Sequence, residues 1–264
     1  MKNLIAKFAG LALAVGLATG AAQAGKIDEI RERGTVRIGV SLGGEPIGFR
    51  DAQNNPVGYD VDVATMLAEK LGVPVEFVDV SGDARISMLV SGQIDIAVAN
   101  TSATLERAKS VDFSIPYNRA GLRLIVQKDA GISKIEDLAG KKIVVGRGST
   151  GETFIQKAAP QAELVYTDNF SPEGVLLLQQ KRVDAAIEDS SLLDYLATKN
   201  DSLVTLPGLH SNDPIGIAVA KGDEGFVRWI DMFVSDYIQS GAYEANYKKW
   251  WGEAANPPAL TPLW

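Results

Sequence analysis

The chain contains no cysteine and only one histidine, and both facts limit the chemistry open to it. Without cysteine it has no disulfide framework, no thiolate nucleophile, no zinc–cysteine site and no lipid-modified cysteine. The single histidine, His210, rules out multi-histidine metal sites and makes a Ser-His-Asp triad improbable. We therefore expect no metal site, no cofactor and no catalytic residues.

An excess of basic side chains is also missing. The 264 residues carry 26 basic and 33 acidic groups, a net charge of −7. This charge argues against a nucleic-acid partner, because binding phosphate needs a basic surface. Apolar residues make up 46% of the chain, which is typical of a soluble globular protein. The length is near the size at which one hydrophobic core stops growing, so it predicts two lobes or domains.

The first 24 residues have the three parts of a secretory signal. Lys2 and Lys7 come first, residues 8–18 are apolar, and Ala22-Gln23-Ala24 forms a small-x-small cleavage site. The apolar part is too short for a transmembrane helix, and no later segment reaches the roughly 18 apolar residues that a span needs. An uncleaved anchor is the alternative. We expect cleavage after Ala24 and a periplasmic location.

Short β-branched runs alternate with amphipathic stretches in the rest of the chain, which predicts an α/β protein with mainly parallel sheets. Strands are expected at 35–40, 73–80, 94–99, 122–127, 141–146, 164–166, 183–187 and 215–220. Helices are expected at 60–71, 84–90, 133–138, 150–158, 172–180, 191–199 and 224–240. Pro116 predicts a break, and the prolines at 257, 258 and 262 predict a non-helical tail along the surface.

A weak internal repeat points to a binding site. Residues 92–99 resemble residues 181–188, and each expected strand ends in polar residues, Asn100-Thr101-Ser102 in the first and Asp189-Ser190 in the second. Open α/β sheets bind ligands outside the carboxyl ends of their strands, so two such ends predict one ligand held between two lobes. A chance likeness of two buried strands is the alternative.

Arg107 lies five residues beyond Ser102, where a helix beginning near Thr104 would turn it back toward the strand end. A guanidinium group matches a carboxylate with two parallel hydrogen bonds. A solvent-exposed arginine is the alternative. Asp189 offers a carboxylate that can accept from an ammonium group, or it caps the following helix. Together, Arg107 and Asp189 fit the two charges of an amino-acid zwitterion.

A glycine-rich turn over 145–152 joins an expected strand to an expected helix. Free N–H groups at a helix N-terminus attract anions, so Ser149 and Thr150 are candidates for holding the other side of a carboxylate. Ordinary helix capping is the alternative, and the two roles can coexist. The turn is no phosphate loop, because the Gly-x4-Gly-Lys-Ser/Thr order is absent.

At these residues the chain resembles the periplasmic solute-binding proteins of family 3, the amino-acid receptors of ABC importers. Residues 58–63, Gly-Tyr-Asp-Val-Asp-Val, are similar to the family signature, and further matches lie at 83–86, 92–95, 104–109, 111–117, 137–141, 148–150 and 183–185. The resemblance implies a two-lobed type II fold with two mixed sheets, flanking helices and hinge segments near 117–123 and 210–217. The expected lobes are 25–117 with 212–264, and 118–211.

The resemblance also implies roles for individual residues. Arg107 becomes the clamp for the α-carboxylate, helped by Ser102 and Thr150, and Asp189 becomes the partner of the α-ammonium, together with the carbonyl of Asn100. The expected binding residues are Asn100, Thr101, Ser102, Arg107, Ser149, Thr150 and Asp189, with Arg85 and Arg147 for the ligand side chain.

Gly44 and Gly82 stand where the family often has aromatic residues, so we expect an open, polar pocket like that of the glutamate/aspartate receptors. Arg85 and Arg147 then supply charge for a side-chain carboxylate, unless both lie solvated at the surface. We expect a monomeric, non-catalytic receptor that delivers a polar or acidic L-amino acid to an ABC permease in the inner membrane. The alternatives are a cyclohexadienyl or arogenate-type dehydratase, with Glu188 as its general acid, and a ligand presenter for a chemoreceptor.

Overall fold

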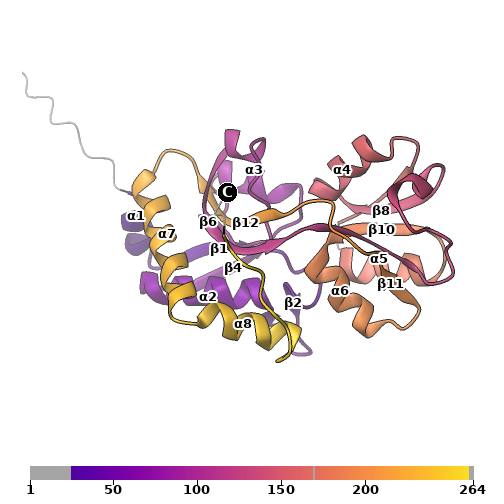
Figure 1. The fold of residues 1–264 in the computed structure, drawn as a ribbon. Helices are drawn as coiled ribbons and strands as arrows, with labels where there is room; N and C mark the ends of the chain where they lie inside the picture. The colour runs from indigo at the N-terminus through magenta and orange to yellow at the C-terminus, as the bar shows by residue number, and fades with distance from the viewer. Residues whose placement is uncertain (1–24, 169, 262–264) are drawn as a thin grey trace, which may run out of the picture.

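The structure is a computed structural model that describes residues 25–168 and 170–261. The expected signal at 1–24 and Pro262 lie outside the described residues. Two five-stranded mixed sheets, each with helices on both faces, form two lobes (Figure 1). The two-lobed α/β fold predicted from the sequence is thereby confirmed.

The first lobe is built on a sheet with the strand order β4-β1-β5-β12-β6. Strand β1 (Val36–Val40) is parallel to β4 (Val75–Asp79) and to β5 (Ile96–Ala97). Strand β12 (Asp213–Ala220) is antiparallel to β5 and to the edge strand β6 (Val111–Ala120). The remaining elements of this lobe are the hairpin β2 (Phe49–Arg50) and β3 (Pro56–Val57), and the helices α1 (Lys26–Arg33), α2 (Tyr59–Leu71), α3 (Ala84–Val90), α7 (Glu224–Gln239) and α8 (Ala242–Trp251).

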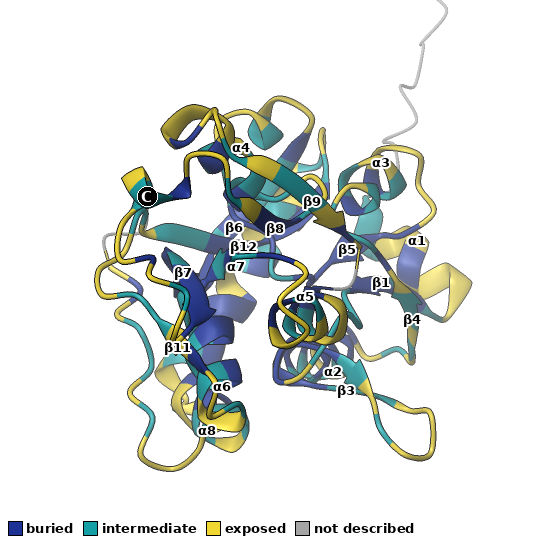
Figure 2. Ribbon diagram, turned by 90° about the vertical axis from the view of Figure 1, so that its right-hand side faces the viewer, coloured by how far each residue is buried: buried dark blue, intermediate teal, exposed yellow. Residues whose placement is uncertain are grey.

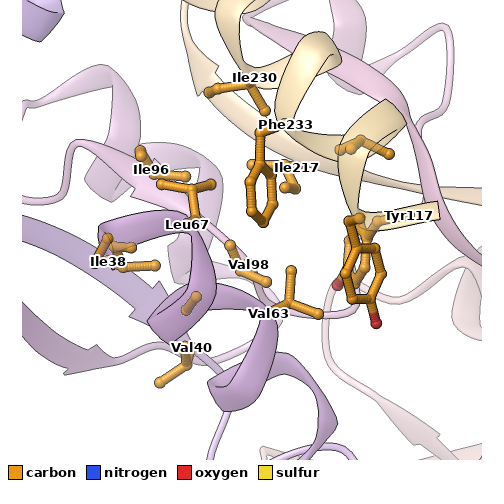
Figure 3. Packing of buried hydrophobic residues seen from close by; sticks show 14 of the residues in the cluster. Ile38, Val40, Val63, Leu67, Ile96, Val98, Tyr117, Ile217, Ile230 and Phe233 are labelled. Atoms are coloured by element: carbon orange, nitrogen blue, oxygen red, sulfur yellow. The ribbon is translucent and has the colours of Figure 1, made fainter. Parts of the chain in front are cut away.

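The spacing of apolar residues explains how the helices of this lobe pack. Val63 and Leu67 lie one turn apart on α2, and Phe233 of α7 belongs to the same buried cluster. Leu67 lies beside Ile96 of the sheet, and Val63 lies beside Val98 (Figure 3). Burying a side chain of this size stabilises the fold by about 1.5–3 kcal/mol. Helix α2 ends at Gly72, which has a φ of 75° and whose N–H donates to two carbonyls of the last turn.

The second lobe is built on a sheet with the strand order β11-β7-β10-β8-β9. Strand β10 (Ala185–Asp189) lies between β7 (Leu122–Gln127), to which it is antiparallel, and β8 (Lys142–Gly146), to which it is parallel. Helix α4 (Thr150–Ala158) covers one face, and α5 (Phe170–Gln179) and α6 (Ser190–Lys199) cover the other. The edge strands are β9 (Glu163–Thr167) and β11 (Leu203–Thr205). In both sheets the central strands are buried, whereas loops and outer helix faces are exposed (Figure 2).

Two chain segments that connect the lobes lie side by side. Gly121, between β6 and β7, is so close to the second segment that a Cβ atom there would lie 2.2 Å from the carbonyl oxygen of Ser211. Hydrogen bonds join the two segments, from the N–H of His210 to the carbonyl of Leu122 (2.8 Å) and from the N–H of Leu122 to the hydroxyl of Ser211 (2.9 Å). The indole of Trp251 in α8 also reaches the second lobe.

Three local expectations were wrong, and two helices were not expected. Pro116 does not break the chain but lies inside β6, where an edge strand tolerates a residue without an N–H. No helix begins near Thr104; a single 3-10 turn spans Arg107–Lys109 instead. The strand expected at 94–99 is shortened to β5, and α1 and α8 were not expected at all. Residues 252–261 contain no helix, as expected.

Candidate functional site

A cavity of about 90 Å³ lies between the lobes, at the carboxyl ends of their central strands. The first lobe contributes the residues that follow β1 and β5. The second contributes the end of β10, the turn between β8 and α4, and the first residues of α5. This is the place where open α/β sheets bind ligands, and the cavity is of a size for a small solute rather than a polymer.

The first-lobe wall is held by a buried network around Asn100. This residue has a φ of 45°, in the left-handed region. Its carbonyl and that of Ala99 accept hydrogen bonds from one Arg85 nitrogen, at 3.3 and 2.5 Å. Arg85 is only 8% exposed, and burial lowers its pKa. It is therefore a buried cleft residue and not a solvated surface arginine.

Asp60 lies directly behind this wall, at the start of α2. Its carboxylate accepts a hydrogen bond of 2.8 Å from the hydroxyl of Tyr117. Its second oxygen is buried and has no partner among the residues that the structure describes. Burial raises the pKa of Asp60 to about 7, although hydrogen bonds from Tyr117 and the backbone of Asn100 oppose the shift. The motif at 58–63 thus supports the cleft without lining it.

Arg107 lines the cavity and contacts both lobes. One guanidinium nitrogen donates to the carbonyl of Ser102 (2.8 Å), and the other donates to the carbonyl of Gly148 in the second lobe (2.9 Å). The Thr104 hydroxyl accepts a hydrogen bond of 3.2 Å from the backbone N–H of Arg107. Burial lowers the pKa of Arg107 to about 10, with repulsion from Arg85 as the second cause. The group remains cationic at neutral pH.

The turn before α4 forms part of the second-lobe wall. Ser149 is the N-cap of this helix, and its hydroxyl accepts from the N–H of Glu152 at 3.1 Å. The carboxylate of Glu152 accepts in turn from the N–H of Gly148 at 2.8 Å. Capping therefore occupies the Ser149 side chain, while Thr150 lines the cavity as the first helical residue. The first N–H groups of a helix have no partner within it, so they are suited to an anion.

Two neighbouring carboxylates end β10. Asp189 is 4% exposed and accepts a hydrogen bond of 2.7 Å from the side-chain amide of Asn100, which links the two lobes. Burial raises the pKa of Asp189 to about 6, although the bond from Asn100 opposes the shift. Burial also raises the pKa of Glu188 to about 8, with the charge of Asp189 as the second cause.

The expected binding residues mostly gather in this cavity. Arg107 and Asp189, expected from opposite lobes, line the same space, and all the others except Thr101 line it too. Thr101 is fully buried, and its hydroxyl donates to the carbonyl of Ala99. Arg147 lines the cavity, but its guanidinium pairs with Asp168 (3.2 Å) and lies over the ring of Tyr166 (4.8 Å).

Several lining residues were not expected from the sequence, among them Phe170 and Leu192, and Glu188 was expected only as the general acid of the alternative dehydratase. A binding role for Glu188 could have been expected, because it directly precedes Asp189 at the end of an expected strand. Phe170 and Leu192 lie in the first turns of helices α5 and α6, where apolar residues are indistinguishable from core residues in the sequence. Within the described ranges, no three His, Cys, Asp or Glu side chains are placed to hold a metal ion. None of the described helices has the length and apolar character that crossing a membrane requires.

The model of the bacterial extracellular solute-binding proteins, family 3, matches residues 36–253 of this chain. The chain belongs to this family. It is 30% identical over 226 residues to an ABC transporter glutamine-binding protein of Bacillus subtilis, covering 84% of this chain and 82% of that protein. Relatives of this kind are amino-acid-binding components of ABC importers. The resemblance found in the sequence is thereby confirmed.

Solved structures of this family share the fold. The solute receptor for L-cysteine of Neisseria gonorrhoeae has a TM-score of 0.83 and 30% identity, covering 89% of this chain and 98% of that one. An ancestral amino-acid-binding protein, described as a precursor of cyclohexadienyl dehydratase, has a TM-score of 0.80 and 34% identity, covering 85% of this chain and 99% of that one.

Proposed function

We propose that this protein is a non-catalytic receptor that captures one free L-amino acid between its lobes and delivers it to an ABC permease. One observation carries the proposal: Arg107 of the first lobe and Asp189 of the second line the same cavity. An amino acid presents a carboxylate and an ammonium on one carbon. Arg107, with the start of α4, suits the carboxylate, and Asp189, with the carbonyl of Asn100, suits the ammonium.

The strength required of such a site is modest. A micromolar Kd corresponds to about −8 kcal/mol. Hydrogen bonds to charged groups contribute about 1.5–3 kcal/mol each, so the contacts of the two α-groups supply much of what is needed. Because Arg107 and Asp189 belong to different lobes, only a cleft closed around the ligand makes all of these contacts. Ligand binding then favours the closed state by its differential affinity.

The proposal includes the location and the lobes expected from the sequence. The mature protein is a periplasmic monomer produced by cleavage after Ala24. Its lobes are 25–117 with 212–264, and 118–211, and they close about the paired segments at Gly121 and Ser211. Members of the family are extracellular, which supports the location. The ligand has a polar or acidic side chain, since the groups that line the cavity are mainly polar or charged.

A thermal-shift screen of the twenty L-amino acids tests the receptor function. At a hundredfold excess over Kd, mass action predicts about 3 kcal/mol of stabilisation for the cognate ligand. Arg107→Ala should remove this shift for every amino acid, whereas the exposed Lys109→Ala should retain it. The proposal is wrong if no amino acid raises the melting temperature of the wild-type protein. Turnover of prephenate or arogenate would favour a dehydratase instead.

A further inference from the structure

The proposed function leaves two charged groups of the cavity without a ligand partner. Arg107 and Asp189 take the two α-groups, and Arg147 and Asp168 of the cavity pair with each other. Arg85 and Glu188 remain, and both line the same space. Outside the Arg147–Asp168 pair, the four side chains carry two positive and two negative charges when ionised. A ligand with a neutral side chain therefore leaves no uncompensated charge in the cavity. An uncompensated charge in a buried site would be strongly destabilising.

The carboxylate of Glu188 makes no polar contact of its own within the described residues. It is half-buried at the end of β10, and among the described residues it has no hydrogen-bond or ion-pair partner. One Arg85 nitrogen donates hydrogen bonds to the carbonyls of Ala99 and Asn100. The Nε of Arg85 is buried and has no partner within residues 25–168 and 170–261. Arg85 and Glu188 interact electrostatically, yet they form no ion pair. A donor and an acceptor thus face one cavity without joining each other.

We propose that Arg85 and Glu188 together recognise a side-chain carboxamide, so that the receptor selects L-glutamine or L-asparagine. This inference rests on the proposed receptor function and narrows its ligand class. A carboxamide carries one oxygen that accepts and one NH₂ group that donates, on the same carbon. Its oxygen accepts from Arg85 while its nitrogen donates to Glu188, which satisfies both groups at once.

The other classes of side chain satisfy only one of the two groups. A carboxylate pairs with Arg85 but repels Glu188, and Arg147 does not compensate because Asp168 already pairs with it. A cationic side chain pairs with Glu188 but leaves Arg85 facing a like charge. An aliphatic side chain leaves both groups without a partner, which is the costly case for polar groups removed from water.

The ionisation of Glu188 is compatible with this role. Its pKa is raised by burial and by the negative charge of Asp189, while Arg85 and Arg107 oppose the shift. Burial and Asp189 together raise the pKa to about 8, and burial is the larger cause. An ammonium group beside Asp189 offsets the second cause, so ligand binding lowers this pKa and shifts Glu188 toward the carboxylate form. A carboxylate at position 188 accepts from the ligand amide and discriminates against an acidic side chain.

Isothermal titration calorimetry with L-glutamine, L-asparagine, L-glutamate, L-arginine and L-alanine tests the assignment. We expect the wild-type protein to bind L-glutamine or L-asparagine at least about tenfold more tightly than each of the other three. The isosteric Glu188→Gln should reduce the preference for the amide over L-glutamate at least about tenfold, chiefly by improving L-glutamate binding. Glu163→Gln, at an exposed position on β9 of the same lobe, should leave the preference unchanged.

The outcomes separate the two proposals. If the wild-type protein binds L-glutamate or L-arginine as tightly as either amide, the carboxamide assignment fails while the receptor function stands. The carboxamide assignment also fails if Glu188→Gln has the wild-type melting temperature and the wild-type ratio of amide affinity to L-glutamate affinity. If no amino acid binds at all, the receptor function itself is wrong, and the assignment falls with it.

Discussion

Replacing Asp60 by asparagine should remove part of the pH dependence of folding stability. Asp60 is 1% exposed behind the cleft wall, and burial raises its pKa from 3.8 to about 7. A carboxyl group whose pKa rises on folding binds its proton more tightly in the folded state. Its stabilising effect is therefore complete below the unfolded pKa of 3.8 and is lost as the pH rises through about 7.

The size of the effect follows from the shift. Each pKa unit corresponds to about 1.4 kcal/mol, so ionising the buried Asp60 costs roughly 4 kcal/mol over the whole range. Between pH 6 and pH 8 its share of the lost free energy of unfolding is roughly 1 kcal/mol. Asp189 and Glu188, whose pKa values are also raised, add losses of the same sign. Asp60→Asn should still lose the stability that Asp189 and Glu188 cost as the pH rises, and should lack only the loss caused by Asp60.

Urea denaturation of the ligand-free protein at pH 6 and pH 8 measures this contribution. We expect wild-type stability to fall by roughly 1 kcal/mol more than that of Asp60→Asn over this interval. The variant also buries an amide nitrogen, which changes its stability at both pH values and cancels in the comparison. Asp201→Asn, at an exposed turn, should behave like wild type. Equal pH dependence in wild type and Asp60→Asn would show that the pKa of Asp60 does not rise on folding.

Two further changes test the cleft. Amino-acid affinity should weaken as the pH falls below about 6, because protonation of Asp189 removes the negative charge that binds the ligand ammonium. Calorimetry at pH 7 and pH 5 measures this change, and equal affinities at the two pH values would contradict it. Gly82→Ala should weaken binding by about tenfold or more, because its Cβ would lie 2.8 Å from the carbonyl oxygen of Arg147 and keep the lobes apart. Ligand-free Gly82→Ala should unfold at the wild-type temperature, and wild-type affinity in this variant would show that full closure is not required.

The elements that could be predicted from the sequence are those with a strong apolar pattern. Helix α2 was expected from its spacing, and β7 and β12 from their apolar runs. Helix α1 was missed because only Ile30 of its eight residues is buried, which gives almost no periodic signal. The break expected at Pro116 shows a second limit, since a proline is tolerated when its strand lies at a sheet edge, and strand order is a tertiary property.

The position of the cleft followed from polar residues at two strand ends, but the orientation of each side chain did not. Of the neighbours Asn100, Thr101 and Ser102, the middle one points away from the cavity, and a run of three polar residues gives no sign of this. The bond between Asn100 and Asp189 joins residues 89 positions apart, so it arises only when the lobes close. The free carboxylate of Glu188 is likewise recognised only once every neighbouring partner is known.

The decisive test of the two-lobe site is a crystal structure of the protein with the amino acid found by the screen. We expect the ligand carboxylate within hydrogen-bond distance of the Arg107 guanidinium, and the ligand ammonium within hydrogen-bond distance of the Asp189 carboxylate. A ligand that binds outside this cavity, or whose two α-groups contact only one lobe, would contradict this expectation.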